Sequence, residues 1–251
     1  LILNSLPVKK IFSDFDGTLT ESDGSLSKNF IIVLDTLQQK GLPLSIVTGR
    51  SLSWGHFFLT HFPQVESVIC EGGGVFLYRD LSGVMIEDNL VLESDYLYLE
   101  KIASDLVSSF NCPLSLDSFG RRTDRAIDLY RFKDNKNLKK QIEDFLREKD
   151  LSFSSSNVHL NFWKGEVSKS HAMKHLLRKK YPSYQVEDCL FFGDAPNDES
   201  VFESFPNSVG VSNIQPHLEC MKHHPKVILK GKENEGVKGV LNYLMGKEKA
   251  S

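Results

Sequence analysis

The sequence has little of what marks secreted proteins. It contains only four cysteines in 251 residues, with no CxxC pair and no regular spacing, so a disulfide framework is not predicted. Cys70 and Cys189 lie in apolar, strand-like runs, where a thiol packs as a small hydrophobic group. This pattern favours a reducing compartment, and we expect a cytoplasmic protein.

Long apolar runs and long basic runs are also missing. No segment approaches the ~20 apolar residues of a transmembrane helix, and the apolar stretch within residues 1–7 is too short for a signal peptide. The net charge is -3, and the densest basic run, at residues 178–180, ends a predicted helix, where it suits the helix dipole. We therefore expect no membrane and no nucleic acid as partner. The oligomeric state is left open.

The composition, with 40% hydrophobic and 25% charged residues, is that of a globular protein with a core. Residues 9–15 read as a buried strand, and a helix follows from an N-cap at Ser27 to Gly41. Further apolar strands are predicted at residues 44–47, 68–70, 190–192, 209–211 and 227–229. This alternation predicts an α/β fold, a Rossmann-like doubly wound parallel sheet with right-handed crossovers.

The middle of the chain has a different pattern. Helices are predicted at residues 94–109 and 135–149, and each is followed by β-rich sequence, at residues 125–130 and 158–162. This pattern predicts a small α+β cap domain inserted into the core. We expect a catalytic core formed by residues 1–85 and 162–251, with the cap at residues 86–161.

Four polar clusters stand at or near strand ends, and the carboxyl ends of parallel strands form the ligand-binding edge of such sheets. The first is Asp14-Phe15-Asp16-Gly17-Thr18. Strand alternation points Asp14 and Asp16 the same way. One carboxylate can then attack phosphorus, while the other protonates the leaving oxygen and activates water. Taken alone, an Asp-Gly turn after a strand is a common structural feature.

The second and third clusters are weaker on their own. Thr48, Gly49 and Arg50 follow a strand, where a hydroxyl and backbone N–H groups can bind phosphate oxygens. Lys169 follows an apparent N-cap at Ser168, an unfavourable place for a cation unless an anion lies opposite. A strand–helix junction and a solvated surface lysine are the structural alternatives.

The fourth cluster is Gly193-Asp194-Ala195-Pro196-Asn197-Asp198. Asp194 directly follows a strand and is placed to bind a hard cation such as Mg²⁺, which prefers carboxylate oxygens. Asn197 can donate a hydrogen bond to phosphate, and Asp198 can hold metal-bound water or orient Lys169. The structural alternative is an Asx-rich helix cap.

Together the clusters resemble all four motifs of the haloacid dehalogenase-like (HAD) hydrolase superfamily, in order along nearly the whole chain. The presence of both Asp14 and Asp16 resembles its phosphatase and phosphomutase branch. The insert between the second and third motifs resembles the subgroup with an α/β cap there, which includes Cof-like, sucrose-phosphatase-like and trehalose-phosphatase-like proteins. One departure is residues 71–74, Glu-Gly-Gly-Gly, where that subgroup often has Asn-Gly after the third strand.

The resemblance implies a Mg²⁺-dependent phosphatase that acts on a small phosphorylated metabolite, expected to be a sugar phosphate. Asp14 would form an aspartyl-phosphate, and Asp16 would act as acid and then base. Mg²⁺ would be held by Asp14, the Asp16 carbonyl and Asp194, with Asp198 farther away. The phosphate-binding and substrate-binding residues would be Thr48, Gly49, Arg50, Lys169 and Asn197.

In the predicted cap, Arg121, Arg122 and Arg125 form a basic group that would contact the rest of the substrate; a solvated strand edge is the alternative. Two other functions stay open. A phosphomannomutase-like phosphotransferase would keep the same motifs but protect the aspartyl-phosphate from water. A non-catalytic binding module would have lost motif residues, and none is lost.

Overall fold

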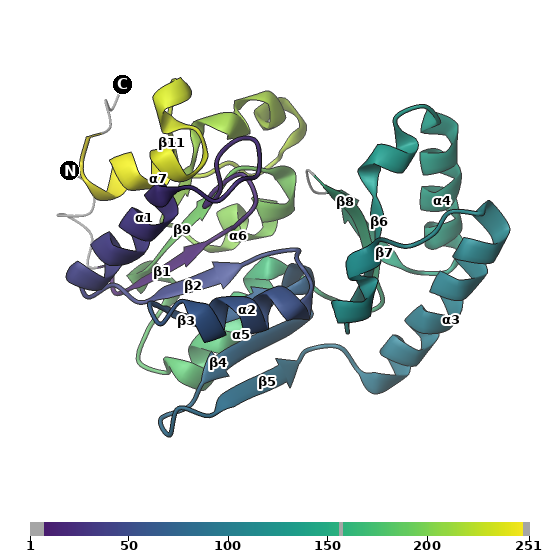
Figure 1. Ribbon diagram of the computed structural model, residues 1–251, viewed down its shortest axis with the longest axis horizontal. Coiled ribbons are helices and arrows are strands. Elements are labelled where there is room, and N and C mark those ends of the chain that lie inside the picture. Colours follow the sequence, from purple (N-terminus) through teal and green to yellow (C-terminus); the bar gives the residue numbers. More distant parts are fainter. Residues whose placement is uncertain (1–7, 156–157, 248–251) are drawn as a thin grey trace.

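The computed structural model describes residues 8–155 and 158–247. It contains two α/β units, a large one built on an eight-stranded sheet and a smaller one built on a three-stranded sheet (Figure 1). The N-terminal stretch considered above as a signal peptide lies outside the described residues. Among the described helices, none combines the length and apolar character needed to cross a membrane.

The large sheet has the order β11-β10-β9-β1-β2-β3-β4-β5. Its parallel strands are β1 (Lys10–Ser13), β2 (Leu44–Val47), β3 (Val65–Cys70), β9 (Cys189–Gly193), β10 (Ser208–Gly210) and β11 (Val227–Ile228). In β1, Ile11 pairs with Leu44 on one side and Leu190 on the other, so β1 is central. The predicted Rossmann-like sheet is confirmed.

Two strands at one edge of this sheet differ from the prediction. β4 (Val75–Arg79) pairs antiparallel with β3, and β5 (Met85–Asn89) pairs antiparallel with β4. The turn at residues 71–74 is too short for the crossover that parallel pairing requires, so the chain reverses. The sheet is therefore mainly parallel, with an antiparallel edge.

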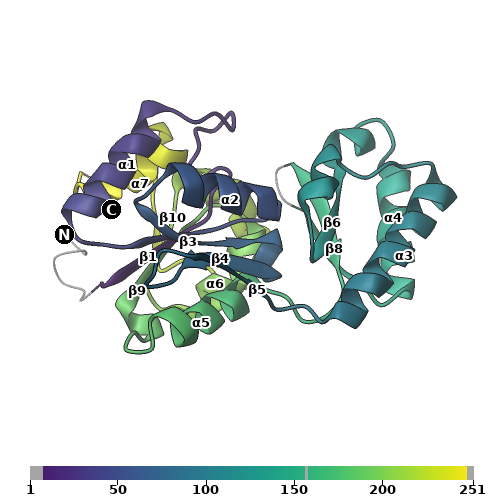
Figure 2. The same ribbon diagram turned by 60° about the horizontal axis from the view of Figure 1, so that its bottom comes forward.

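Helices cover both faces of the sheet (Figure 2). Helices α1 (Lys28–Gln39), α2 (Leu52–His61) and α7 (Gly236–Leu244) pack on one face, and α5 (Lys169–Lys180) and α6 (Glu199–Ser204) on the other. Successive residues of β1 serve the two cores, because Ile11 packs into the first and Phe12 into the second. The predicted N-cap is present, since the Ser27 hydroxyl accepts a hydrogen bond from the Asn29 N–H at 3.2 Å.

The smaller unit, called the cap from here on, has its own hydrophobic core. It comprises α3 (Glu93–Phe110), β6 (Asp124–Asp128), α4 (Lys136–Glu148), β7 (Ser152–Ser155) and β8 (His159–Trp163). Its antiparallel sheet has the order β6-β8-β7 and lies between the helices α3 and α4 and the large unit (Figures 1 and 2). The domain division stays a prediction; β5 and β8 favour placing its boundaries after residues 89 and 163.

Candidate active site

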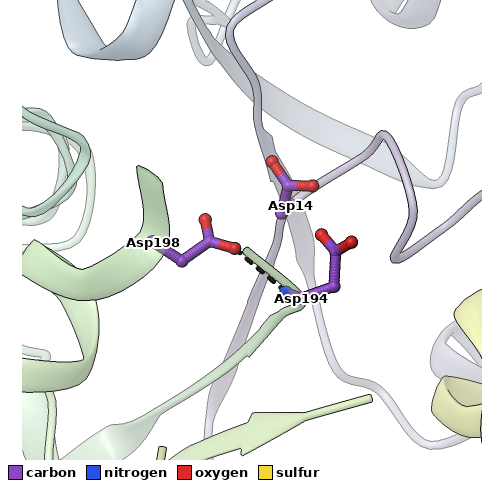
Figure 3. Close-up of side chains that lie close together, drawn as sticks. All are labelled: Asp14, Asp194 and Asp198. Carbon is purple, nitrogen blue, oxygen red and sulfur yellow. Dashed lines mark hydrogen bonds between the residues drawn. The ribbon is translucent and has the colours of Figure 1, made fainter. Parts of the chain in front are cut away.

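Three carboxylates meet at the carboxyl edge of the large sheet. Asp14 follows β1 and donates its backbone N–H to the Phe192 carbonyl of β9 at 2.8 Å. Asp194 follows β9, and Asp198 ends the turn before α6. Figure 3 shows the three side chains lying close together. All three are buried, and one oxygen of each lies within 4.8 Å of the others.

Lys169, the first residue of α5, is buried against this cluster. Its Nζ lies 2.5 Å from Asp14 Oδ1 and 2.6 Å from Asp198 Oδ1. The turn after β3 lies close to the start of α5. A Cβ on Gly73 would lie only 2.4 Å from the Ser168 carbonyl oxygen, so the two segments can approach only because residue 73 has no side chain. Gly73 also has a φ of +117°, so glycine is required there. The first, third and fourth sequence clusters are thus brought together.

The cluster is short of positive charge. Burial raises the pKa of Asp14 well above its ordinary value; Lys169 opposes this effect, and Asp198 and Asp194 add to it. Burial, with repulsion from Asp198, also raises the pKa of Asp194 to about 7. Burial alone would lower the pKa of Lys169, but the carboxylates of Asp14 and Asp198 outweigh it and raise that pKa. Three carboxylates thus share one ammonium group, an arrangement that suits a further cation with oxygen ligands.

Both carboxylate oxygens of Asp198 accept hydrogen bonds from neighbouring groups. Its Oδ2 accepts hydrogen bonds from the backbone N–H groups of Asp194 at 3.0 Å and Ala195 at 3.3 Å, and the first of these is the dashed line in Figure 3. Its Oδ1 accepts from Lys169. These hydrogen bonds hold the turn at residues 194–198 and the Lys169 side chain in place.

Asp194 is oriented by two donors. The Thr18 hydroxyl donates to Oδ1 at 3.2 Å, and Asn213 Nδ2 donates to Oδ2 at 2.8 Å. Asn213 Nδ2 also contacts the Gly17 carbonyl oxygen at 3.0 Å, so it joins the first and fourth motifs. Sequence reasoning missed Asn213. The one available signal was its position just after β10, at the same edge of the sheet.

Arg50 contacts the second carboxylate of the first motif. Its Nε donates to Asp16 Oδ2 at 2.8 Å and its Nη2 to Asp16 Oδ1 at 2.5 Å, a bidentate pair. The guanidinium also lies 4.7 Å from the centre of the Trp54 ring. The Thr48 hydroxyl accepts the backbone N–H of Arg50 at 3.0 Å. In this structure, Arg50 therefore binds the carboxylate that was predicted to act as acid and base.

The cap closes over this edge. A cavity of about 20 Å³, room for about one water molecule, is lined by Asp14, Asp16, Gly49, Arg50, Ala195 and Asn197 from the large unit and by Val158 and His159 from the cap. A second cavity of about 460 Å³ shares Gly49 and Asn197 with it, and reaches Lys169, Asn161 and Trp163. Within the described part of the chain, the buried Asn197 Oδ1 and Trp163 Nε1 have no hydrogen-bond partner. Both residues line the larger cavity.

Each of the three cap arginines has an acidic partner. The pairs are Arg121 with Asp117 and Asp124, Arg122 with Glu87, and Arg125 with Glu100. Arg121 is buried and also donates to the Gly49 carbonyl oxygen at 3.1 Å. The three arginine side chains thus pair with different acidic residues. A role for them in substrate selection stays a prediction.

Comparison with known proteins agrees with this geometry. The family described as haloacid dehalogenase-like hydrolase matches residues 11–111 and 84–241. A phosphoglycolate phosphatase from Methanobrevibacter smithii is 23% identical, over 92% of this chain and 96% of the relative.

Two solved structures share the fold. The crystal structure of Thermoplasma acidophilum 0175 has a TM-score of 0.75 at 16% identity, covering 95% of this chain and 98% of that one. A HAD/COF-like hydrolase from Plasmodium vivax has a TM-score of 0.72 at 21% identity, covering 98% and 96%. The chain belongs to the haloacid dehalogenase-like hydrolase family, and the predicted resemblance to that superfamily is confirmed.

Proposed function

We propose that this hydrolase is a Mg²⁺-dependent phosphatase that cleaves a small phosphorylated metabolite through an aspartyl-phosphate on Asp14. The observation that carries the proposal is the buried contact between Asp14 and Lys169 beside two further carboxylates. Phosphatase chemistry in general, the hydrolysis of phosphoric monoesters, is supported by family membership and by the phosphatase names of the relatives.

The residues present fit a magnesium ion. Asp14 and Asp194 offer buried carboxylate oxygens, the kind of ligand that Mg²⁺ takes together with phosphate and water. Asp198 would orient Lys169 and the turn without binding the ion directly, because its oxygens already accept hydrogen bonds from Lys169 and from backbone N–H groups. The ion would supply positive charge for the transferring phosphoryl group.

In the first step, an Asp14 carboxylate oxygen forms a bond to phosphorus while the bond from phosphorus to the ester oxygen breaks. Asp16 gives its proton to that leaving oxygen. In the second step, Asp16 takes a proton from water as the water oxygen attacks phosphorus, which releases Asp14 and inorganic phosphate. Lys169 neutralises charge that would otherwise repel a carboxylate nucleophile, so catalysis rests mainly on positioning and electrostatics.

Asp16 must exchange its present partner during this cycle. Its carboxylate is bound by Arg50 in the structure, and the leaving oxygen of a substrate would take that place. Arg50 would then be free to contact the phosphoryl group, as the sequence predicts. Thr48, Gly49 and Asn197 line the same edge and would position the phosphoryl oxygens.

The larger cavity is proposed to hold the leaving group, since it adjoins Lys169 and Asn197. Its lining includes the polar side chains of Asn161, Lys169 and Asn197, which favour a small, hydrophilic metabolite such as a sugar phosphate. The M. smithii relative is named for phosphoglycolate, which makes that compound a second candidate of the same reaction class.

Release of inorganic phosphate from a panel of sugar phosphates, 2-phosphoglycolate and p-nitrophenyl phosphate, with Mg²⁺ and with EDTA, tests the proposal. We expect release with Mg²⁺ and none with EDTA. A phosphotransferase would instead need a bisphosphate activator and show little net release. A binding module would release no phosphate from any compound in the panel.

A further inference from the structure

Glu71 occupies an unusual position at the end of β3. Its side chain is buried, with 1% of the residue exposed. Its backbone has a φ of +55°, in the left-handed region that residues other than glycine seldom adopt. Such a conformation persists only where surrounding contacts hold it. The contacts that hold Glu71 come from both units of the molecule.

On the cap side, the Glu71 carboxylate accepts a row of backbone N–H groups. The N–H of Arg122 lies 3.0 Å from both oxygens, and those of Thr123 and Asp124 lie 2.5 and 3.2 Å from Oε2. The Thr123 hydroxyl adds a fourth donor at 2.7 Å. On the core side, Oε1 accepts the N–H of Leu52 at the start of α2, at 3.0 Å. A single buried carboxylate therefore joins the core to the segment that leads into β6.

The surrounding backbone is shaped for this contact. A Cβ on Gly74 would lie 2.0 Å from the Thr123 hydroxyl oxygen, so a side chain there would push the cap segment away. Beside it, Arg121 and Asn161 of the cap both donate to the Gly49 carbonyl oxygen, at 3.1 and 3.5 Å. The position of residues 121–124 thus sets how cap side chains meet the predicted phosphate-binding residues.

In the closed arrangement, little room is left beside the nucleophile. The cavity lined by Asp14 and Asp16 holds about 20 Å³, and Val158 and His159 of the cap form part of its wall, so a phosphate ester needs the cap or the Arg50 side chain to move. Contacts between Glu71 and the cap amides exist in the closed arrangement and would be broken on opening. They therefore favour the closed state.

We propose that Glu71 is a positioning residue that holds residues 121–124 of the cap on the core, and so sets the population of the closed, substrate-binding state. Among the described residues, its side chain has no hydrogen bond or ion pair with Asp14, Asp16 or Lys169, although Glu71 lines the larger cavity. The inference rests on the proposed function only for its kinetic test, and its structural test needs no activity. It also gives a role to the segment at residues 71–74, where the chain departs from the Asn-Gly of its subgroup.

The structural test is hydrogen exchange of the backbone amides in Glu71→Gln. The variant keeps the size of the side chain but places an NH₂ group against N–H donors. We expect exchange at residues 122–124 to become at least ~10-fold faster than in wild type, because opening is the route to exchange. The Ala195 amide, held by Asp198, should not change, which shows that the core is folded. Unchanged exchange at residues 122–124 would overturn the proposal.

Glu87→Gln is the matched control, since it also removes a carboxylate beside Arg122. The Glu87 carboxylate forms an ion pair with the Arg122 side chain, which is half exposed, and such a pair contributes little. We expect hydrogen exchange close to that of wild type. If Glu87→Gln accelerated hydrogen exchange at residues 122–124 as much as Glu71→Gln does, loss of any nearby carboxylate would open the cap. That result would overturn a special role for Glu71.

The kinetic test uses p-nitrophenyl phosphate with Mg²⁺. If Glu71→Gln lowers the closed fraction to about one tenth, the KM rises about 10-fold while kcat changes less than ~2-fold, because bound substrate restores closure. A purely structural role would lower kcat with the amount of folded enzyme and leave KM unchanged, and that result would contradict the proposal. Thr123→Val, which removes a single donor, should raise KM about 2- to 3-fold and serves if Glu71→Gln fails to fold. No hydrolysis by wild type would refute the phosphatase function and leave the exchange test intact.

Discussion

Lys169→Met is the most direct perturbation of the buried charge cluster. The substitution keeps the length of the side chain and removes the ammonium group that lies 2.5 and 2.6 Å from Asp14 and Asp198. Those carboxylates would stay buried without their cation. Removing one partner of a buried ion pair costs about 3–5 kcal/mol, and we expect this loss in the unfolding free energy of metal-free protein. Bound Mg²⁺ would replace part of the missing charge and reduce the loss.

The assay is urea unfolding at pH 8 with EDTA and again with Mg²⁺, for wild type, Lys169→Met and Lys174→Met. Lys174 lies in the same helix but outside the charge cluster, and its variant should unfold like wild type. Lys169→Met should also lower kcat by about 10²–10³, the loss typical of a removed electrostatic contact in an active site. A wild-type urea midpoint in EDTA would refute the charge argument, and turnover within about 10-fold of wild type would refute the proposed role in catalysis.

Three further substitutions have distinct expected results. Asp14→Asn should lower phosphate release by at least ~10³-fold while the unfolding free energy in EDTA stays within ~1 kcal/mol of wild type, because Asp198 still pairs with Lys169; wild-type turnover would show that Asp14 is not the nucleophile. Asn213→Ala removes the group that donates to Asp194 and to the Gly17 carbonyl. Half-maximal activity should then need about 10- to 100-fold more Mg²⁺, with kcat nearly unchanged. An unaltered Mg²⁺ titration would contradict this. Lys10→Met addresses stability away from the site. Burial lowers the pKa of Lys10 to about 7, although Glu66 opposes this. Between about pH 7 and 10.5 the unfolded chain therefore binds more protons than the folded protein, and wild-type stability rises with pH there. The variant should therefore be more stable than wild type by about 1–4 kcal/mol at pH 6 and gain less at pH 10, and a larger gain at pH 10 would be inconsistent with a buried lysine of lowered pKa.

The sheet order could be predicted only where the pattern has one physical solution. Apolar strands separated by helices, such as residues 9–15 and 44–47, pair in parallel because each crossover helix must pack on a face of the sheet, and β1 and β2 do so. The β4–β5 hairpin was missed, because no strand was predicted at residues 75–79 and the predicted domain boundary between residues 85 and 86 divides β5. β5 is only half buried, being an edge strand, and so has a weak hydrophobic signal.

The catalytic edge was the most predictable part of the site. Asp14, Lys169 and Asp194 each stand beside a strand end or a helix start, so local sequence fixes where each side chain begins and the sheet fixes where they meet. Arg121 was less predictable. Its charge suggested a surface for anions, but Asp117 and Asp124 neutralise it inside the molecule, and a pairing of that kind depends on the tertiary fold.

Glu71 shows why the contacts between cap and core carry so weak a sequence signal. Its main partners are backbone N–H groups of residues 122–124, and every residue except proline offers such a group. No complementary charged side chain is therefore needed on the cap, and the Thr123 hydroxyl, which also donates to Glu71, is too common a group to be recognised from sequence. The remaining signal is a carboxylate placed directly after a buried strand and followed by three glycines, of which Gly73 lets α5 approach and Gly74 lets the cap segment approach. A buried acid in that setting requires several hydrogen-bond donors. A carboxylate directly after a buried strand therefore indicates that another segment of the chain, here residues 122–124 of the cap, supplies those donors.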